Sequence, residues 1–560
     1  MTLPGRMLRG AVLITVLAAL ALPILAGLGL TLAASLGYLP AIGARTVSVQ
    51  AFLMLFGLPG LGTSLWLTLV TGIGSTLLAL IIAIVLLVRW PGAARLLPVL
   101  LATPHAALAL GLAFLLSPSG WISRGLAPLL GWAQPPDVAT VNDPMGLALI
   151  FGLLVKEVPF LLLMLLAAVR QIPWRRHMAL GQAMGHGPAS VWIKIVVPQL
   201  YPLIRLPLFI VLAFALSVVD MAMILGPSHP PTLAVALTRW FNDPDPAMIL
   251  PASAGAMLLV ALTGGSIGLW MAAERAVARF GRLWLRRGGR GGGLGSTLAL
   301  PAAMGRFALL LGLCALLVLA VWSLAWRWPY PALLPDSWSL RGWMRADWAG
   351  PLVTTLQIAL TTTALSLMLA IAWLEGEDRG HLPRARWATG LIVLPLLLPQ
   401  IGFLYGLHAL FLKLGICGCL WAVIWAQVLF VFPYVMLALS EPWRSLDPRH
   451  VRSAAALGAG PLRRLVAVKL PLLIAPVLAS AALGIAVSVT QYLPTLFMGA
   501  GRVTTLTTEA VTLASGADRR VTAIYGLLLA VLPLCAYGLA LRLPGLIFRN
   551  RRDMSPRHDT

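Results

Sequence analysis

Long uninterrupted runs of apolar residues dominate the chain. The hydrocarbon core of a bilayer is about 30 Å thick, and an α-helix needs about 20 consecutive apolar residues to cross it. Runs of this length recur along the sequence, so we predict an all-α polytopic membrane protein with about twelve transmembrane helices. The expected spans are 11–34, 61–88, 95–116, 146–169, 200–226, 247–270, 307–326, 351–374, 388–412, 417–439, 472–498 and 520–542.

Composition supports a membrane environment. Of 560 residues, 59% are hydrophobic and 11% charged, whereas a soluble domain has about 45–50% apolar and 25% charged residues. The net charge of +23 would suggest nucleic acid in a soluble protein, but these bases lie in short segments between apolar runs. Membrane lipid is therefore the expected environment and nucleic acid is not an expected partner.

The basic segments alternate along the chain, which predicts the orientation. Bases are concentrated at the N-terminus, in the loops around Arg89, Arg170 and Arg444, and at the C-terminus. Because cytoplasmic loops carry an excess of Lys and Arg, both termini are expected in the cytoplasm. The uncharged stretch from Gly10 to Ala44 is longer than the apolar core of a signal peptide, so it is interpreted as an uncleaved first helix.

The two halves of the sequence are copies of each other. The segment Pro104 to Gly111 corresponds to Pro399 to Gly406, and Pro159 corresponds to Pro433. We therefore expect two parallel six-helix repeats with a path between them. The predicted division is a first membrane domain at 1–273, a basic Gly-rich connector at 274–306, and a second membrane domain at 307–560.

One loop motif occurs in both halves. After the fourth span of each half, a glycine is followed thirteen residues later by a proline: Gly185 with Pro198, and Gly458 with Pro471, 273 residues apart. With 53 Gly and 42 Pro in the chain, such a pair is expected at about 0.7% of positions, so chance explains the repeated loop poorly. The glycine predicts a helix stop with positive φ, and the proline predicts the entry into the next span.

These loops resemble the EAA loop of ABC importer permeases, and their degenerate form is similar to the fused iron(III) and thiamine permeases. The resemblance implies the type I importer permease fold and a loop that docks on an ATPase subunit. Two departures stand out: Ala179 and Arg452 replace the acidic residue of the family motif, and Leu180-Gly181 replaces Ala-Ala. The residues expected to couple to the ATPase are Ala179, Gly181, Gly185, Ile195, Pro198, Ser453, Ala454, Gly458, Val468 and Pro471.

The resemblance also implies partners. The sequence lacks the G-x-x-x-x-G-K-[S/T] phosphate-binding pattern, so ATP hydrolysis is expected on two copies of a separate ABC ATPase subunit rather than on this chain. A periplasmic substrate-binding protein and a location in the bacterial inner membrane are implied in the same way. The four cysteines lie in apolar runs, and neither a metal site, a catalytic residue nor a cofactor is expected.

Polar residues within the expected spans are candidates for the translocation path. Ionisable groups at that depth usually face the bundle interior or a wet cavity. Asp220 lies in the fifth span, where the second half has Gln491. Pairing of Lys156 with Asp220 for stability is the alternative interpretation. The candidate path residues are Lys156, Glu157, Asp220, Gln400 and Gln491.

Two other functions are alternatives to the permease. A secondary transporter of the major facilitator type also has six plus six helices, and the segment Gly376 to Gly380 faintly resembles a loop signature of that family. An integral membrane enzyme would need clustered carboxylates, but the 18 acidic residues are scattered. The paired loops favour the permease over both alternatives.

Overall fold

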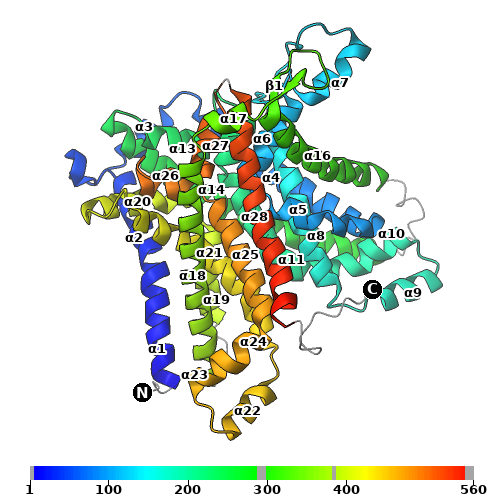
Figure 1. Ribbon diagram of the computed structural model, residues 1–560, viewed down its shortest axis with the longest axis vertical. Coiled ribbons are helices and arrows are strands. Elements are labelled where there is room, and N and C mark those ends of the chain that lie inside the picture. The colour runs from blue at the N-terminus through cyan, green and yellow to red at the C-terminus, as the bar shows by residue number, and fades with distance from the viewer. Residues whose placement is uncertain (1–4, 287–297, 381–385, 517, 549–560) are drawn as a thin grey trace.

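The computed structural model describes residues 5–286, 298–380, 386–516 and 518–548, and these are helical almost throughout (Figure 1). Within them, ten helices are long and apolar enough to cross a membrane, and two bent helix pairs raise the number to twelve if each pair is one span. The expected all-α polytopic architecture is confirmed. The sheet of the described part is an antiparallel hairpin of β1 (Ala325–Arg327) and β2 (Ser337–Trp338).

The helices follow each other in the same order in the two halves. Those of the first half are α1 (Gly5–Val16), α2 (Leu22–Ser35), α3 (Gln50–Phe56), α4 (Leu61–Arg89), α5 (Leu97–Ala102), α6 (His105–Leu116), α7 (Trp121–Leu130), α8 (Leu147–Val169), α9 (Trp174–Ala183), α10 (Pro188–Val191), α11 (Val197–Ser217), α12 (Asp220–Leu225), α13 (Leu233–Phe241) and α14 (Ile249–Arg286). Those of the second half are α16 (Ala299–Leu324), α17 (Arg341–Arg345), α18 (Ala349–Gly380), α19 (Arg386–Leu397), α20 (Gln400–Lys413), α21 (Leu420–Arg444), α22 (Pro448–Ala456), α23 (Pro461–Arg464), α24 (Leu470–Leu472), α25 (Ile474–Val489), α26 (Leu493–Gly499), α27 (Leu506–Leu513) and α28 (Arg519–Ile547). Short π-helical turns η1 (Leu17–Ala21), η4 (Trp192–Val196) and η6 (Leu465–Lys469) and 3-10 turns η2 (Pro40–Ile42), η3 (Pro91–Arg95) and η5 (Pro246–Met248) complete the set.

Two expected spans are broken at equivalent prolines. The span 95–116 divides at Pro104, after which α6 begins, and the span 388–412 divides at Pro399, after which α20 begins. Proline lacks an N–H and disfavours helical geometry in the residue before it, and Thr103 is extended accordingly. The second break bends the chain by 99° between 390–397 and 400–413.

Two other spans are shorter than expected. The spans 200–226 and 472–498 were expected to be continuous, but α11 ends at Ser217 and α25 ends at Val489. Each is followed by a short helix, α12 or α26. β-Branched residues around both breaks, among them Val218 and Thr490, lower the local preference for helix.

The connector also differs from the expectation. Helix α14 continues through residues 274–286, and α16 begins at Ala299, so much of the expected linker 274–306 is helical. Glu274 anchors this extension because its carboxylate lies 2.8 Å from the guanidinium of Arg205 and accepts a 2.6 Å hydrogen bond from Tyr201. The Gly-rich run 288–295 lies outside the described residues.

The first long helix of each half packs against the other half. Helix α2 lies along α20, and α16 lies along α6. The α2–α20 crossing is close because a Cβ on Gly406 would overlap the carbonyl of Gly27, and small residues of this kind allow close helix packing in membranes. The amide of Gly406 also donates to the hydroxyl of Thr31 at 3.1 Å. The two halves are therefore interlocked.

A matched pair of hydrogen bonds repeats inside each half. The hydroxyl of Thr68 on α4 accepts from the amide of Leu233 at 2.9 Å, and the hydroxyl of Thr355 on α18 accepts from the amide of Leu506 at 2.9 Å. Leu233 and Leu506 are the first residues of α13 and α27. Free N–H groups at a helix start need such acceptors when they are buried. The bulkiest fully buried side chains, Phe403, Phe411, Phe430 and Phe432, lie on α20 and α21.

Candidate functional site

The two motif loops have the same backbone. Each is a helix, a turn, a short second helix and a π-helical turn: α9, α10 and η4 in the first half, and α22, α23 and η6 in the second. The turns η4 and η6 begin at residues 192 and 465, which are 273 positions apart, the same spacing as Gly185 and Gly458. The repeat seen in the sequence is thus also present in the local geometry.

Both glycines adopt the predicted left-handed conformation. Gly185 has φ 79° and Gly458 has φ 80°, a region that residues with a Cβ rarely adopt. Each glycine ends a helix in a Schellman motif, in which two amides reach back to carbonyls left free in the last turn. The amide-to-carbonyl bonds are Gly185 to Gln182 (2.9 Å) and His186 to Gly181 (3.0 Å), then Gly458 to Ala455 (3.0 Å) and Ala459 to Ala454 (3.0 Å).

The second helix of each loop starts at a proline. Pro188 and Pro461 occupy the first helical position, where a missing N–H has no cost because that amide would be unpaired in any case. The predicted residues Ile195 and Val468 lie in the π-helical turns, and Pro198 and Pro471 lie at the start of the following helices.

The small residues of the first loop have different surroundings from those expected. Gly181 is buried against Val191 of α10, and a Cβ there would overlap that side chain. Its size therefore serves packing inside the loop, whereas we expected it to allow docking. The predicted residues Ala179, Gly185, Ile195, Pro198, Ser453 and Gly458 are exposed, and Ala454, Val468 and Pro471 are half-buried.

The exposed apolar side chains of these loops were not predicted from the sequence. Met184 is 69% exposed and Leu457 is 88% exposed, and each directly precedes its motif glycine. Leu180, Leu462 and Val466 are also exposed. A gathering of exposed apolar residues on a loop rich in basic residues is typical of an interaction surface. The position before the glycine was the available signal, because it is apolar in both copies.

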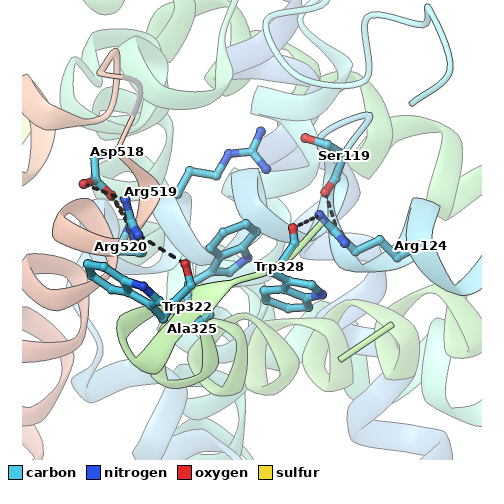
Figure 2. A pocket seen from close by; sticks show the side chains of 9 residues that line it. Ser119, Arg124, Trp322, Ala325, Trp328, Asp518, Arg519 and Arg520 are labelled. Carbon is cyan, nitrogen blue, oxygen red and sulfur yellow. Dashed lines mark hydrogen bonds and ion pairs between the residues drawn. The ribbon is translucent and has the colours of Figure 1, made fainter. Parts of the chain in front are cut away.

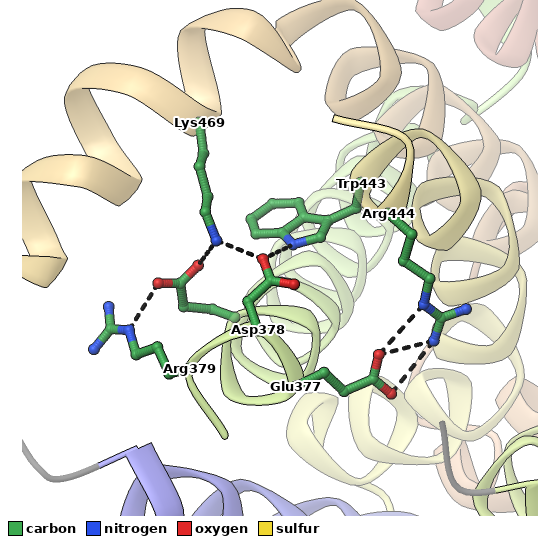
Figure 3. Close-up of polar contacts among 7 residues, drawn as sticks. Glu377, Asp378, Arg379, Trp443, Arg444 and Lys469 are labelled. Carbon is green, nitrogen blue, oxygen red and sulfur yellow. Dashed lines mark hydrogen bonds and ion pairs between the residues drawn. The ribbon is translucent and has the colours of Figure 1, made fainter. Parts of the chain in front are cut away.

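A network of ion pairs holds the second loop against α18 (Figure 3). The ammonium of Lys469, the last residue of η6, lies 2.6 Å from Glu375 and 2.5 Å from Asp378. Glu375 also pairs with Arg379 at 2.7 Å. Lys469 is 5% exposed, and a buried charge of this kind is stable only when it is paired.

The network extends to the end of α21. Arg444 lies 2.9 Å from Glu377, and the indole N–H of Trp443 donates to Asp378 at 3.0 Å. The segment 376–380, which faintly resembled a loop of major facilitator transporters, contributes two of the carboxylates of this network. The loop lacks the acidic residue of the family motif, and the acids that hold it come from α18 instead.

Among the candidate path residues, Lys156 caps the C-terminal end of α5. Its ammonium donates to the carbonyls of Leu100 (3.0 Å), Leu101 (3.0 Å) and Thr103 (2.5 Å), at the C-terminus of α5 and the break before Pro104. A cation is favourable at a helix C-terminus, where carbonyls have no intrahelical partner. No ion pair joins Lys156 to Asp220 among the described residues, so the expected alternative pairing is wrong.

The other candidates lie at different places in the bundle. Glu157 is 3% exposed, and among the described residues its carboxylate makes no hydrogen bond of normal geometry, with the hydroxyl of Ser75 as its nearby polar group. Asp220 and Gln400 are the first residues of α12 and α20. Asp220 and Leu493 occupy equivalent positions in the two repeats, because each is the first residue of its short helix, α12 or α26. Asp220 was expected to correspond to Gln491, which lies two positions earlier.

Gln491 belongs to a buried polar cluster that was not predicted from the sequence. Gln427 donates to the hydroxyl of Thr495 at 3.1 Å and accepts from Ser488 at 2.5 Å. Gln427, Ser488 and Gln491 line a small pocket together with Thr355 and Thr505. The side-chain oxygen of Gln491 has no partner in the described part of the chain. These neutral groups come from α18, α21, the end of α25, the segment that leads into α26, α26 itself and the start of α27.

Comparisons with known proteins agree with this architecture. The family "Binding-protein-dependent transport system inner membrane component" matches residues 364–544. The chain is 32% identical over 509 residues to the inner membrane ABC transporter permease protein YnjC of Escherichia coli (strain K12), covering 88% of this chain and 90% of that protein. It is also 28% identical over 131 residues to ORF1 of Streptomyces antibioticus, named as a candidate ABC transporter permease, covering 23% of this chain and 57% of that protein.

The length of the first match decides the assignment. It extends over both repeats and both motif loops, and the segment from Ser488 to Thr512 already resembles the Ynj-type permease when it is read as sequence. The described residues form an almost entirely helical fold with ten to twelve candidate spans, and helices are one of the two structures that can cross a bilayer. The chain therefore belongs to the inner membrane permeases of binding-protein-dependent ABC transporters.

Proposed function

We propose that this chain forms the translocation path of an ABC importer and couples it to ATP hydrolysis on two separate ATPase subunits. One subunit docks on α9 and α10, and the other docks on α22 and α23. Both loops and both termini face the cytoplasm in this proposal, and a periplasmic binding protein delivers the substrate. The membrane domains are 1–273 and 307–560, joined by the connector 274–306.

The observation that carries this proposal is the repetition of one loop backbone. Two identical ATPase subunits would need two matching docking sites, and the chain supplies two loops with the same Schellman turn at Gly185 and Gly458. Each loop also places an exposed apolar side chain, Met184 or Leu457, directly before the turn. Exposed apolar anchors framed by basic residues suit a protein partner.

Within the membrane, the proposed path residues are Glu157, Asp220, Gln400 and Gln491. Lys156 supports this path without lining it directly. Glu157 and Gln491 have buried oxygen atoms that make no hydrogen bond of normal geometry in the described part, and a buried polar atom of this kind is costly unless the protein uses it. Lys156 has all three donors occupied by carbonyl groups, so its direct role in this proposal is to hold the broken third helix.

The test is a tagged purification in mild detergent from native membranes. Wild type is expected to recover about two ATPase subunits per permease, and a Gly185→Asp, Gly458→Asp variant is expected to lose them because both turns need positive φ. The matched control is Gly131→Asp, Gly415→Asp. These two glycines also have positive φ and open surroundings, and they lie in loops at the opposite helix ends.

The control should recover the ATPase like wild type, which shows that a left-handed glycine replaced by Asp does not by itself destroy the complex. A wild-type chain that purifies alone and moves solute in response to a proton gradient would contradict the proposal. That result would favour the secondary transporter instead.

A further inference from the structure

A second site lies at the end of the molecule that carries α7 and β1, away from α22 and α23 (Figure 1). A cavity of about 320 Å³ opens there between the two halves. Arg124 on α7 comes from the first half, whereas the other principal lining residues come from the second. These are Trp322, Trp326 and Trp328 around the end of α16 and β1, and Arg519 and Arg520 at the start of α28.

Two of the three arginines are held in place by the protein. Arg124 is 3% exposed, and its guanidinium donates to the carbonyls of Pro329 (2.7 Å) and Ala332 (2.8 Å). Arg520 pairs with Asp518 at 3.1 Å and donates to the carbonyl of Trp326 at 3.2 Å. Burial raises the pKa of Asp518, but the hydrogen bonds and charge of Arg520 outweigh it, so the pKa falls below its usual value. Asp518 therefore remains an anion and offsets one positive charge.

Arg519 has no such partner. Among the described residues it makes no hydrogen bond or ion pair, and its guanidinium lies 5.5 Å from the ring centroid of Trp322. Figure 2 shows its side chain near the indole of Trp322. Two more guanidinium groups, Arg341 and Arg345, lie 5.6 Å and 5.7 Å from the ring of Trp326. The cavity is therefore strongly positive, and Arg519 keeps its N–H donors available for an anionic ligand.

This concentration of arginine is unusual for its place in the membrane. In the proposed orientation the cavity faces the periplasm, where the positive-inside rule predicts few bases. A cluster of basic residues that topology does not explain needs another role. Bidentate binding of a carboxylate is the chemistry for which arginine is suited best.

The two arginines at the start of α28 have no counterpart in the first half. At the spacing of 273 residues, Asp518 corresponds to Asp245, and both side chains accept from the amide two residues later. The next two positions differ, because Arg519 and Arg520 correspond to Pro246 and Ala247. A pseudo-two-fold permease offers a single partner molecule two similar orientations. A positive site in one half distinguishes them, since charge complementarity selects orientation and register.

We infer that the Arg519 cavity receives an acidic side chain of the periplasmic binding protein and fixes which lobe of that protein rests on the second half. This inference builds on the proposed import function. The guanidinium of Arg519 binds the carboxylate of the docked protein, and the indoles of Trp322 and Trp328 pack around it. Arg124 and Arg520 hold the walls of the cavity in place.

The test compares Arg519→Ala with Arg45→Ala, a control at an exposed arginine in the loop after α2. The probe is the purified periplasmic binding protein that stimulates ATP hydrolysis by the wild-type permease–ATPase complex in phosphatidylcholine nanodiscs. Arg519→Ala is expected to raise its half-saturating concentration about tenfold, which is the usual effect of losing one charge-assisted contact. Basal ATP hydrolysis, the ATPase content and the Arg45→Ala variant should remain unchanged.

Two further measurements identify the occupant. Arg519→Lys should recover part of the lost affinity, and a photo-crosslinker at position 326 should attach to a peptide of the binding protein that contains Asp or Glu. Unchanged half-saturation in Arg519→Ala would overturn the inference while leaving the import function intact. A crosslink to phosphatidylglycerol, with an effect of Arg519→Ala only in nanodiscs that contain this lipid, would assign the cavity to a lipid headgroup instead. Failure of every binding protein to stimulate the wild-type complex would contradict the import function itself.

Discussion

The two motif loops share one backbone but are held in place by different side chains. In the second loop, Lys469 at the end of η6 is buried among the carboxylates of α18. At the same position of the first loop, 273 residues earlier, Val196 is fully buried in an apolar cluster. Nearby, the rings of Trp174 and Trp192 pack with centroids 5.6 Å apart.

This difference shows which features of the loops are constrained. The left-handed glycine, the proline at the start of the second helix and the π-helical turn occur in both copies, so the shape of the loop is common to the two halves. The support beneath the loop differs, because apolar packing and a satisfied ion-pair cluster can hold a segment equally well. An acidic residue inside the motif is therefore not required to fix either loop.

The largest expected effect comes from removing the buried cation of the second loop. Lys469→Met removes the buried cation that Glu375 and Asp378 share, and Glu375, whose side chain is 7% exposed, keeps only its pair with Arg379. Breaking a buried pair on one side usually costs about 3–5 kcal/mol, and we expect about 3 kcal/mol because Asp378 is partly exposed. Hydrogen exchange should show lost protection in residues 461–472, with residues 188–199 unchanged.

A charge-free version of the same site is the control. Combining Lys469→Met with Glu375→Gln and Asp378→Asn removes the unpaired anions, so most of the lost protection should return. If residues 461–472 of the single variant Lys469→Met exchange hydrogen as slowly as in wild type, the ion pairs do not hold the loop. The different side chains beneath the two loops would then not differ in how much they stabilise them.

The second prediction concerns the shared feature. Gly185→Ala and Gly458→Ala each place a Cβ on a residue with positive φ, at a cost of about 1–2 kcal/mol. The two substitutions should weaken protection at the ends of α9 and α22 by similar amounts, as measured by hydrogen exchange. Gly460→Ala is the matched control, because Gly460 has φ −67° and open surroundings. A large effect in one loop alone would contradict a common backbone constraint.

The smallest effect is expected at the end of the fourth span. Arg444 pairs with Glu377, whereas Arg170 at the corresponding position is exposed and forms no ion pair among the described residues. Arg444→Ala should lower the free energy of unfolding by about 0.2–1 kcal/mol, less at high salt, because the pair is partly exposed. Arg170→Ala should change it by less than the measurement error. Equal losses of thermal stability in Arg444→Ala and Arg170→Ala would show that the Arg444–Glu377 pair does not distinguish the two halves.

The sequence was sufficient for features that depend on local chemistry. Span positions follow from apolar length, and the helix ends at Gly185 and Gly458 follow from glycine's freedom at positive φ. The equivalence of Pro104 and Pro399 was visible as a repeat. The break at Pro399 within the expected span 388–412 also has a local cause, because proline removes a backbone hydrogen bond.

Features that depend on distant residues could not be read in this way. Lys469 meets Glu375 across 94 positions, and nothing near either residue signals the pairing. The same applies to Gln427 and Ser488, 61 positions apart. The early end of α11 and the register of Asp220 with Leu493 depend on small differences in helix preference. Tertiary packing determines where such helices end. A shift of two residues in one repeat then changes which side chains of the two repeats correspond.

The packing of α2 against α20 means that α2 is synthesised and inserted well before its partner helix. Gly406 meets Thr31 across 375 residues of chain, and a ribosome adding 5–20 residues per second needs about 20 to 75 s to make that stretch. During this interval α2 resides in the bilayer with its final neighbour not yet synthesised, and its small-residue face is covered by lipid. Insertion factors that shelter an early helix until the second half arrives would therefore affect the yield of this protein more than that of a permease whose halves fold one after the other.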